Sequence, residues 1–155
     1  MEPKPLVGVL VGSRTDEPLI HDTLKVLTDM GIPYEFNVMS AHRAPQRVMD
    51  YASVAEERGI EVLIAGAGGS AALPGVVASW TTLPVIGIPL ATSDLGGVDA
   101  LHTIVQMPPG VPVACVAIGA WGARNAAYLA ASILGIKHPS IKQVYTDYRE
   151  GLRKA

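Results

Sequence analysis

Residues 34–65, "YEFNVMSAHRAPQRVMDYASVAEERGIEVLIA", contain a complete unit of strand, loop, helix and strand. The runs at 34–39 and 61–65 are short and largely apolar, which favours strands. Between them, proline opens a segment at residues 45–58 and glycine follows it, as at the two ends of a helix. Apolar residues recur in this segment with helical spacing, at Val48, Ala52 and Ala55. One such unit predicts two parallel strands joined by a helix.

The same alternation continues on both sides of this unit. Further apolar runs bounded by Gly or Pro predict strands over residues 6–11, 84–89 and 112–118. A helix is expected over 15–30, and the more charged segment 138–155 predicts an additional C-terminal helix. The strands are continuous apolar runs, as burial on both faces requires. The sequence therefore predicts an α/β fold: a three-layer, doubly wound parallel sheet of flavodoxin or Rossmann type, with an extra C-terminal helix.

Size and composition restrict the class of protein. A chain of 155 residues has the length of a single domain, so we expect one domain over residues 1–155. With 49% hydrophobic and only 17% charged residues, part of the apolar surface is expected to be covered by other copies of the chain. A net charge of −2 and an aromatic content of 5% argue against a nucleic-acid partner.

The single cysteine and the absence of a long apolar run indicate the compartment. Cys115 has no second cysteine to pair with, which fits a reducing environment. No run approaches the roughly 18–20 apolar residues of a membrane span, and the N-terminus does not have the pattern of a signal peptide. We therefore expect a cytoplasmic protein with no membrane partner.

Polar or glycine-rich segments follow four of the predicted strands. In a doubly wound sheet, ligands bind beyond the carboxyl ends of the strands. These four segments are therefore expected to line one edge: "GSRTD" (12–16), "SAHR" (40–43), "GAGGSAALPG" (66–75) and "LATSDLGG" (90–97).

The first segment places Ser13, Thr15 and Asp16 at the start of the first helix. Free backbone N–H groups there favour an anion such as phosphate. The alternative is plain N-capping by Thr15 or Asp16, and the two can coexist.

The glycines of 66–75 match the dinucleotide pattern G-x-G-x-x-A only weakly, because no acidic residue ends the next strand. We interpret them as allowing the backbone to approach a ligand closely.

His42 and Arg43 stand together where an apolar strand has ended. An imidazole in this position can titrate near neutral pH, and a guanidinium can hold a phosphate or carboxylate. A capping histidine beside a surface arginine is the alternative, and the neighbouring polar loops favour a ligand site. The remaining histidines are assigned structural or solvated roles: His21, His102 and His138.

Several other chemistries lack their residues. The sequence has no G-x-S-x-G elbow, Walker loop or H-E-x-x-H zinc motif. A receiver domain would need an acidic acceptor at the end of the third strand, where Ala65 and Gly66 stand. A non-catalytic, flavodoxin-like nucleotide or flavin binder remains an alternative, because "GSRTD" also suits a flavin phosphate.

Taken in order, the motifs resemble the N5-carboxyaminoimidazole ribonucleotide mutase family of de novo purine biosynthesis. The resemblance spans roughly residues 6–135, and its most specific part is "SAHR" together with "IVQMP". It is carried by "GSRTD", "SAHRAP", "IAGAGGSAALPG", "LPVIGIPL", "GVDALHTIVQMPPGVPVACVAIG" and "NAAYLAASIL".

The resemblance implies a reaction and a set of site residues. The carboxylate of a carbamate on the exocyclic amine of an imidazole ribotide would move to C4 of the ring, with no metal, ATP or biotin cofactor. His42 would be the catalytic acid and base. The substrate-binding residues would be Ser13, Asp16 and Arg43 for the ribose phosphate, and Gly68, Gly69 and Leu73 around the base. Family members are octamers, so a homo-octamer is expected.

Arg43 and "GAGG" favour the mutase over the sister branch, the aminoimidazole ribonucleotide carboxylases, which use CO2 directly and remain the alternative. The chain departs from the usual family pattern at four positions: Ala72, Asp94, Trp121 and Arg124. Residues 125–134 are apolar on nearly every side of the expected helix. One face of the sheet alone is therefore not expected to cover this segment.

Overall fold

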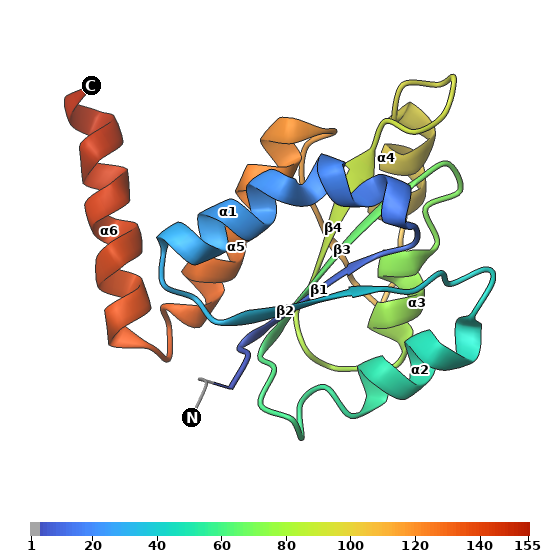
Figure 1. Cartoon of the computed structure of the whole chain (residues 1–155), viewed down its shortest axis with the longest axis horizontal. Coiled ribbons are helices and arrows are strands. Elements are labelled where there is room, and N and C mark those ends of the chain that lie inside the picture. The colour runs from blue at the N-terminus through green and yellow to red at the C-terminus, as the bar shows by residue number, and fades with distance from the viewer. Residues whose placement is uncertain (1–3) are drawn as a thin grey trace.

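The computed structural model describes residues 4–155 and contains one five-stranded parallel sheet with the order β2-β1-β3-β4-β5 (Figure 1). Each neighbouring pair of strands runs parallel, which confirms the predicted doubly wound α/β fold. The strands are β1 (Val7–Val11), β2 (Tyr34–Val38), β3 (Val62–Gly68), β4 (Val85–Leu90) and β5 (Ala114–Cys115).

Helices cover both faces of the sheet, which gives the three layers (Figure 1). Helices α1 and α5 pack on one face, whereas α2, α3 and α4 pack on the other. The helices are η1 (Arg14–Ile20, a 3-10 helix), α1 (His21–Asp29), α2 (Pro45–Ser53), α3 (Leu73–Ser79), α4 (Val98–Val105), α5 (Ala120–Leu134) and α6 (Pro139–Lys154).

Alternation along each strand builds a separate core on each face. In β1, Val9 is buried against the layer of α1 and α5, and the next residue, Leu10, is buried against α2 and α3. The second residue of β1, Gly8, has no side chain because the hydroxyl of Tyr51 on α2 and Leu63 of β3 occupy the space where a Cβ would be. Both faces of the central strands are therefore buried from solvent, as the continuous apolar runs predicted.

Two strands differ from the expected ranges. β3 continues through the glycines to Gly68, three residues beyond the predicted end at 65, because small residues let it keep pairing with β4. The run 112–118 was expected to form a full strand, but β5 contains only Ala114 and Cys115. Proline is the physical reason: Pro89 of β4 has its carbonyl toward β5 and accepts from Gly119 N–H, but it has no N–H to return.

The first helix also differs from the continuous 15–30 helix expected. Residues 14–20 form a 3-10 helix, and the α-helix begins only at His21. Pro18 lies inside the first segment and lacks the N–H that an α-helical hydrogen bond would require at that point. Gly31 (φ 67°) adopts a left-handed conformation just after α1, as expected of a helix stop.

The helix expected over 45–58 is shorter: α2 ends at Ser53, and residues 54–59 form turns in which Gly59 N–H donates to the carbonyl of Glu56, three residues back. Gly59 (φ 97°) therefore ends these turns and not the helix itself.

α5 is covered within the chain. Its buried stripe of alanines packs against the sheet and α1, while Tyr128 stacks on Tyr145 and Tyr148 of α6. Asn125 and Ser132 are exposed. The apolar character of 125–134 is thus explained by α1 and α6, without a second copy of the chain.

In the part of the chain that the structure describes, no helix is both long enough and apolar enough to span a bilayer.

The fully buried Thr23 ties α1 to α5 by donating from Oγ1 to the carbonyl of Ala123 over 2.6 Å. We expect Thr23→Val to lower the free energy of unfolding by about 1 kcal/mol, because an isosteric side chain loses one buried hydrogen bond. Urea denaturation measures the change. Thr28→Val, at an exposed threonine of the same helix, is the control. An unchanged midpoint for Thr23→Val would contradict this role.

Candidate active site at the switch point of the sheet

A hollow of about 140 Å³ lies where three loops meet beyond the carboxyl ends of β1, β2 and β3. β1 and β3 are neighbours in the sheet, and the chain leaves them toward helices on opposite faces, α1 and α3, so the loops diverge there and leave a crevice. The hollow is lined by Gly12, Ser13, Asp16, Ser40, Ala41, His42, Arg43, Ala67, Gly68, Ala71, Ala72 and Leu73. Three of the four predicted loops therefore converge on one site, and six of the seven predicted site residues line it.

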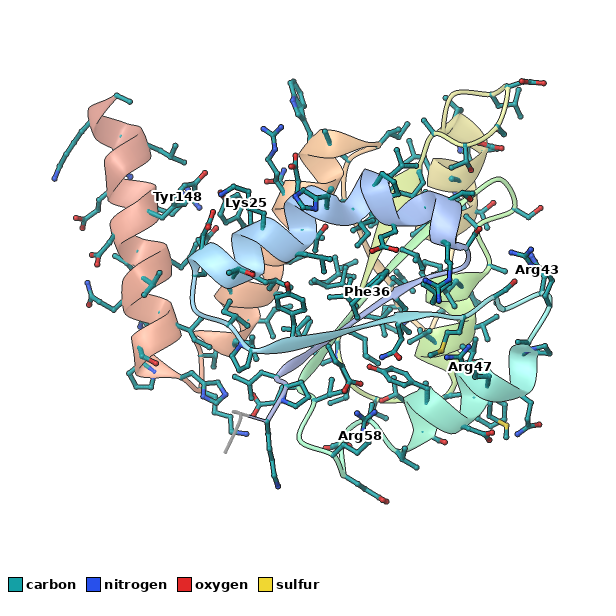
Figure 2. The ribbon with its side chains drawn as sticks, in the orientation of Figure 1. Lys25, Phe36, Arg43, Arg47, Arg58 and Tyr148 are labelled. Atoms are coloured by element: carbon teal, nitrogen blue, oxygen red, sulfur yellow. The ribbon has the colours of Figure 1, made fainter. Side chains whose placement is uncertain are left out.

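Arg43 is held in a frame that spans the first two loops. Its Nη2 donates to the carbonyl oxygen of Gly12 over 3.3 Å, and its Nε donates to Ser40 Oγ over 3.4 Å. Ser40 Oγ also accepts from the backbone N–H of Arg43. The guanidinium is exposed, and Figure 2 shows it at the loop that follows β2. It keeps donors free for an anionic ligand.

Ser13 caps the 3-10 helix. Its Oγ accepts from Thr15 N–H over 3.3 Å and lies 2.9 Å from Thr15 Oγ1. The alternative considered for this segment, capping by Thr15 or Asp16, does not hold, because the cap residue is Ser13. Ser13 has the extended backbone of a cap residue, which leaves Asp16 free to face the hollow.

Asp16 is the acidic residue of the site. Burial raises the pKa of its carboxyl above the ordinary value, while the Ser13 backbone and the charge of Arg43 oppose the shift. Among the lining residues it is the only carboxylate, so it supplies the hydrogen-bond acceptor that ligand hydroxyls would need.

His42 borders the hollow with an exposed imidazole. The turn that carries it is closed by the Ala44 N–H, which donates to the carbonyl of Ser40 over 2.9 Å, and Pro45 starts α2 directly afterwards. A histidine fixed on a short turn and open to a ligand can transfer protons.

The other histidines lie elsewhere in the fold. His21 begins α1 and His102 is on α4, and both are exposed. His138 lies 2.9 Å from Glu61, which also accepts from Lys137 over 2.6 Å. Together these two residues tie the turn before α6 to the start of β3. None of the three histidines lines the hollow.

The third wall is the end of β3 and the turn after it. Gly68 ends the strand, and its carbonyl accepts from Ala71 N–H over 3.0 Å. Gly69 (φ 58°) and the buried Ala71 (φ 37°) both adopt positive φ angles, which is costly for alanine and brings this turn against the hollow. Gly69 was predicted to bind substrate but is not among the lining residues; its role is to make the turn.

Sequence reasoning missed one residue that shapes the site. The sequence assigned no role to Ser40, whereas its hydroxyl accepts from both the backbone N–H and the guanidinium Nε of Arg43. The available signal was the spacing: a serine three residues before an N–H that needs an acceptor forms a local side-chain-to-backbone bond.

The four departures from the family pattern do not act together. Ala72 lines the hollow, so it widens the pocket relative to a larger side chain. Asp94 is exposed in the loop after β4. Trp121 is 75% exposed on α5, and Arg124 pairs with Asp22 of α1 over 2.8 Å. Neither of these two lines the hollow.

A larger hollow of about 390 Å³ lies at the opposite end of β4, lined by residues 81–86 and 110–112 among others. None of its lining side chains titrates near neutral pH, so it lacks a group for acid–base chemistry. Within residues 4–155, no cluster of three or more His, Cys, Asp or Glu side chains is arranged to hold a metal ion.

Comparison with known proteins gives one consistent result. The model of the AIR carboxylase family matches residues 6–155. The chain is 53% identical to the N5-carboxyaminoimidazole ribonucleotide mutase of Pyrococcus horikoshii, over 97% of this chain and 84% of that protein. It is 55% identical to the mutase of Thermotoga maritima, over 97% of this chain and 86% of that one.

Solved structures agree with this relationship. The crystal structure of Treponema denticola PurE superposes with a TM-score of 0.85 at 28% sequence identity, covering 97% of this chain and 92% of that chain. The chain therefore belongs to the AIR carboxylase family.

Proposed function

We propose that the chain catalyses the N5-carboxyaminoimidazole ribonucleotide mutase reaction of purine biosynthesis. The observation that carries the proposal is the convergence of His42, Arg43, Ser13 and Asp16 on one hollow at the switch point. These are the residue types that a phosphorylated ribotide undergoing proton transfer requires. Relatives more than 50% identical over nearly the whole chain carry the mutase name.

Binding follows from the charges around the hollow. Arg43, steadied by Gly12 and Ser40, holds the phosphate with its free donors, and the Ser13 hydroxyl adds a further contact. Asp16 accepts from the ribose hydroxyls. Gly68 and Leu73 border the imidazole, whose reacting atoms then lie toward His42.

His42 serves the chemistry in both directions. It donates a proton to the exocyclic nitrogen as the N–C bond of the carbamate breaks, which leaves CO2 and the neutral aminoimidazole. C4 of the ring then attacks CO2 to form the new C–C bond. The side chain of His42, which became neutral in the first step, takes the proton from C4. Protons and electrons therefore balance over the cycle. Retaining CO2 in the pocket keeps its effective concentration high.

We further propose that the whole chain acts as one ribotide-binding domain in a cytoplasmic homo-octamer. Large exposed apolar side chains support assembly, among them Leu95, Val105, Trp121 and Ile136. Light scattering at micromolar concentration tests it, and a stable monomer would overturn it.

The decisive assay supplies the carbamate ribotide in medium containing labelled bicarbonate. A mutase should convert it quickly with little label in the product, because CO2 is passed on inside the site. Heavy labelling, with good activity from aminoimidazole ribotide and bicarbonate, would identify a direct carboxylase, a result that the smaller side chain at Ala72 would explain. Activity with neither substrate would refute both.

His42→Asn should reduce kcat by about 10²- to 10⁴-fold, because an amide cannot exchange protons near neutral pH. Affinity for the carboxylated ribotide product should stay close to that of the unmodified protein, since the anchors are other side chains. Single-turnover kinetics and calorimetry measure the two quantities. His102→Asn, on α4, is the matched control, and a near-normal kcat for His42→Asn would exclude this residue as the acid and base.

Arg43→Lys should weaken ribotide binding by about 10- to 100-fold, since an ammonium cannot reproduce the planar fork or the bonds to Gly12 and Ser40. Arg47→Lys is the matched control: Arg47 is also exposed, lies one turn further along in α2 and does not line the hollow (Figure 2). Asp16→Ala should also weaken binding. Calorimetry that finds equal affinity in the Arg43 and Arg47 variants would place the phosphate elsewhere.

A further inference from the structure

Thr92, in the loop between β4 and α4, lies directly against the wall of the hollow at Gly68. A Cβ built on Gly68 would lie 1.7 Å from Thr92 Oγ1 and 2.9 Å from Thr92 Cβ. The backbone of Gly68 is not in the left-handed region, in contrast to that of Gly69, so its φ angle does not demand glycine. The space taken by Thr92 is therefore the reason for glycine at this position.

Rotation of the threonine side chain does not open this space. A different χ1 moves the hydroxyl away, but the Cβ of Thr92 stays where the backbone puts it. The carbonyl oxygen of Leu90 also lies close, 3.1 Å from the position of the added Cβ. A side chain at Gly68 would thus require the backbone of β3 or of the loop to move.

The loop is held in place on both sides of Thr92. The Thr92 N–H donates to the carbonyl of Leu90 over 3.0 Å. The next residue, Ser93, donates from Oγ to Asp99 Oδ2 over 2.6 Å and accepts from Leu95 N–H over 3.2 Å. Asp99 in turn accepts from Ala100 N–H at the start of α4. These bonds fix the backbone that carries Thr92, and with it the position of the Thr92 Cβ.

We propose that Thr92 is a positioning residue for the proposed ribotide site. By filling the space next to Gly68, it fixes the end of β3 and the turn closed by the bond from Ala71 N–H to the Gly68 carbonyl, and this segment lines the same hollow as His42. Thr92 does not itself line the hollow. The proposal rests on the proposed function. It gives the fourth polar segment, residues 90–97, a role in the site, because Thr92 packs against a residue that lines the hollow.

The steric pairing is tested by thermal unfolding, which needs no assumption about the substrate. Gly68→Ala should lower Tm, and adding Thr92→Gly should recover most of the loss because the clashing side chain is gone. Gly68→Ala with Thr82→Gly is the matched control, since Thr82 is an exposed threonine next to the opposite end of β4. Equal Tm values for the two double variants would overturn the pairing.

The positioning role is tested by kinetics with the carbamate ribotide. Thr92→Gly alone should lower kcat/KM by about 10-fold or more, because small displacements of a reacting partner are costly, while Tm falls no further than in Thr82→Gly. Thr92→Val fills the same volume and should keep near-normal kcat/KM.

Two outcomes would overturn this role. Normal kcat/KM in Thr92→Gly would mean that the wall needs no support. Loss of activity in Thr92→Val with retention in Thr92→Ser would mean that the hydroxyl contacts the ligand directly. Failure of the unmodified protein to convert the ribotide would refute the proposed function alone, and the pairing would still be judged by Tm.

Discussion

The parallel pairing of β1 with β2 on one side and β3 on the other is the constraint on which the pocket depends. Because the chain leaves β1 and β3 toward opposite faces of the sheet, their connections diverge and leave a crevice at the carboxyl ends of these two strands. Three loops meet in the crevice, and each brings different chemical groups. The first supplies a carboxylate, the second a guanidinium and an imidazole, and the third the backbone of Gly68 with small and apolar side chains. The sheet order thus determines which residues can act together.

Fixing these groups requires interactions between loops that are far apart in the chain. Arg43 reaches back to the carbonyl of Gly12, so the second loop cannot move without the first. Gly68 is confined by Thr92, so the third wall depends on the loop after β4. The geometry of the pocket consequently depends on all four loops, although only three of them border the hollow.

Local patterns accounted for the elements and for most of the site. Five apolar runs predicted five strands, and polar segments after them predicted the edge at which His42, Arg43, Ser13 and Asp16 meet. The errors came from interactions that no local pattern encodes. Neighbouring β4 allowed β3 to extend to Gly68, a proline on β4 shortened β5, and α1 and α6 together covered α5. Likewise, "SAHR" drew attention to His42 and Arg43, but the dependence of Gly68 on Thr92 is visible only when the two loops are brought together in space.

The short β5 also affects how the protein avoids self-association of the wrong kind. An exposed sheet edge presents unpaired N–H and C=O groups on which another strand can add, and long, regular, apolar edges promote aggregation. In this chain one edge strand has only two paired residues, and β2 at the other edge carries Glu35 and Asn37 among its five residues. The sequence is 49% hydrophobic and has few charges, which would otherwise favour aggregation. These two edges offer few backbone groups on which strands of other copies could add without limit. In the proposed assembly, contact between copies would then fall to side chains on helices and loops, where the geometry can produce a closed oligomer.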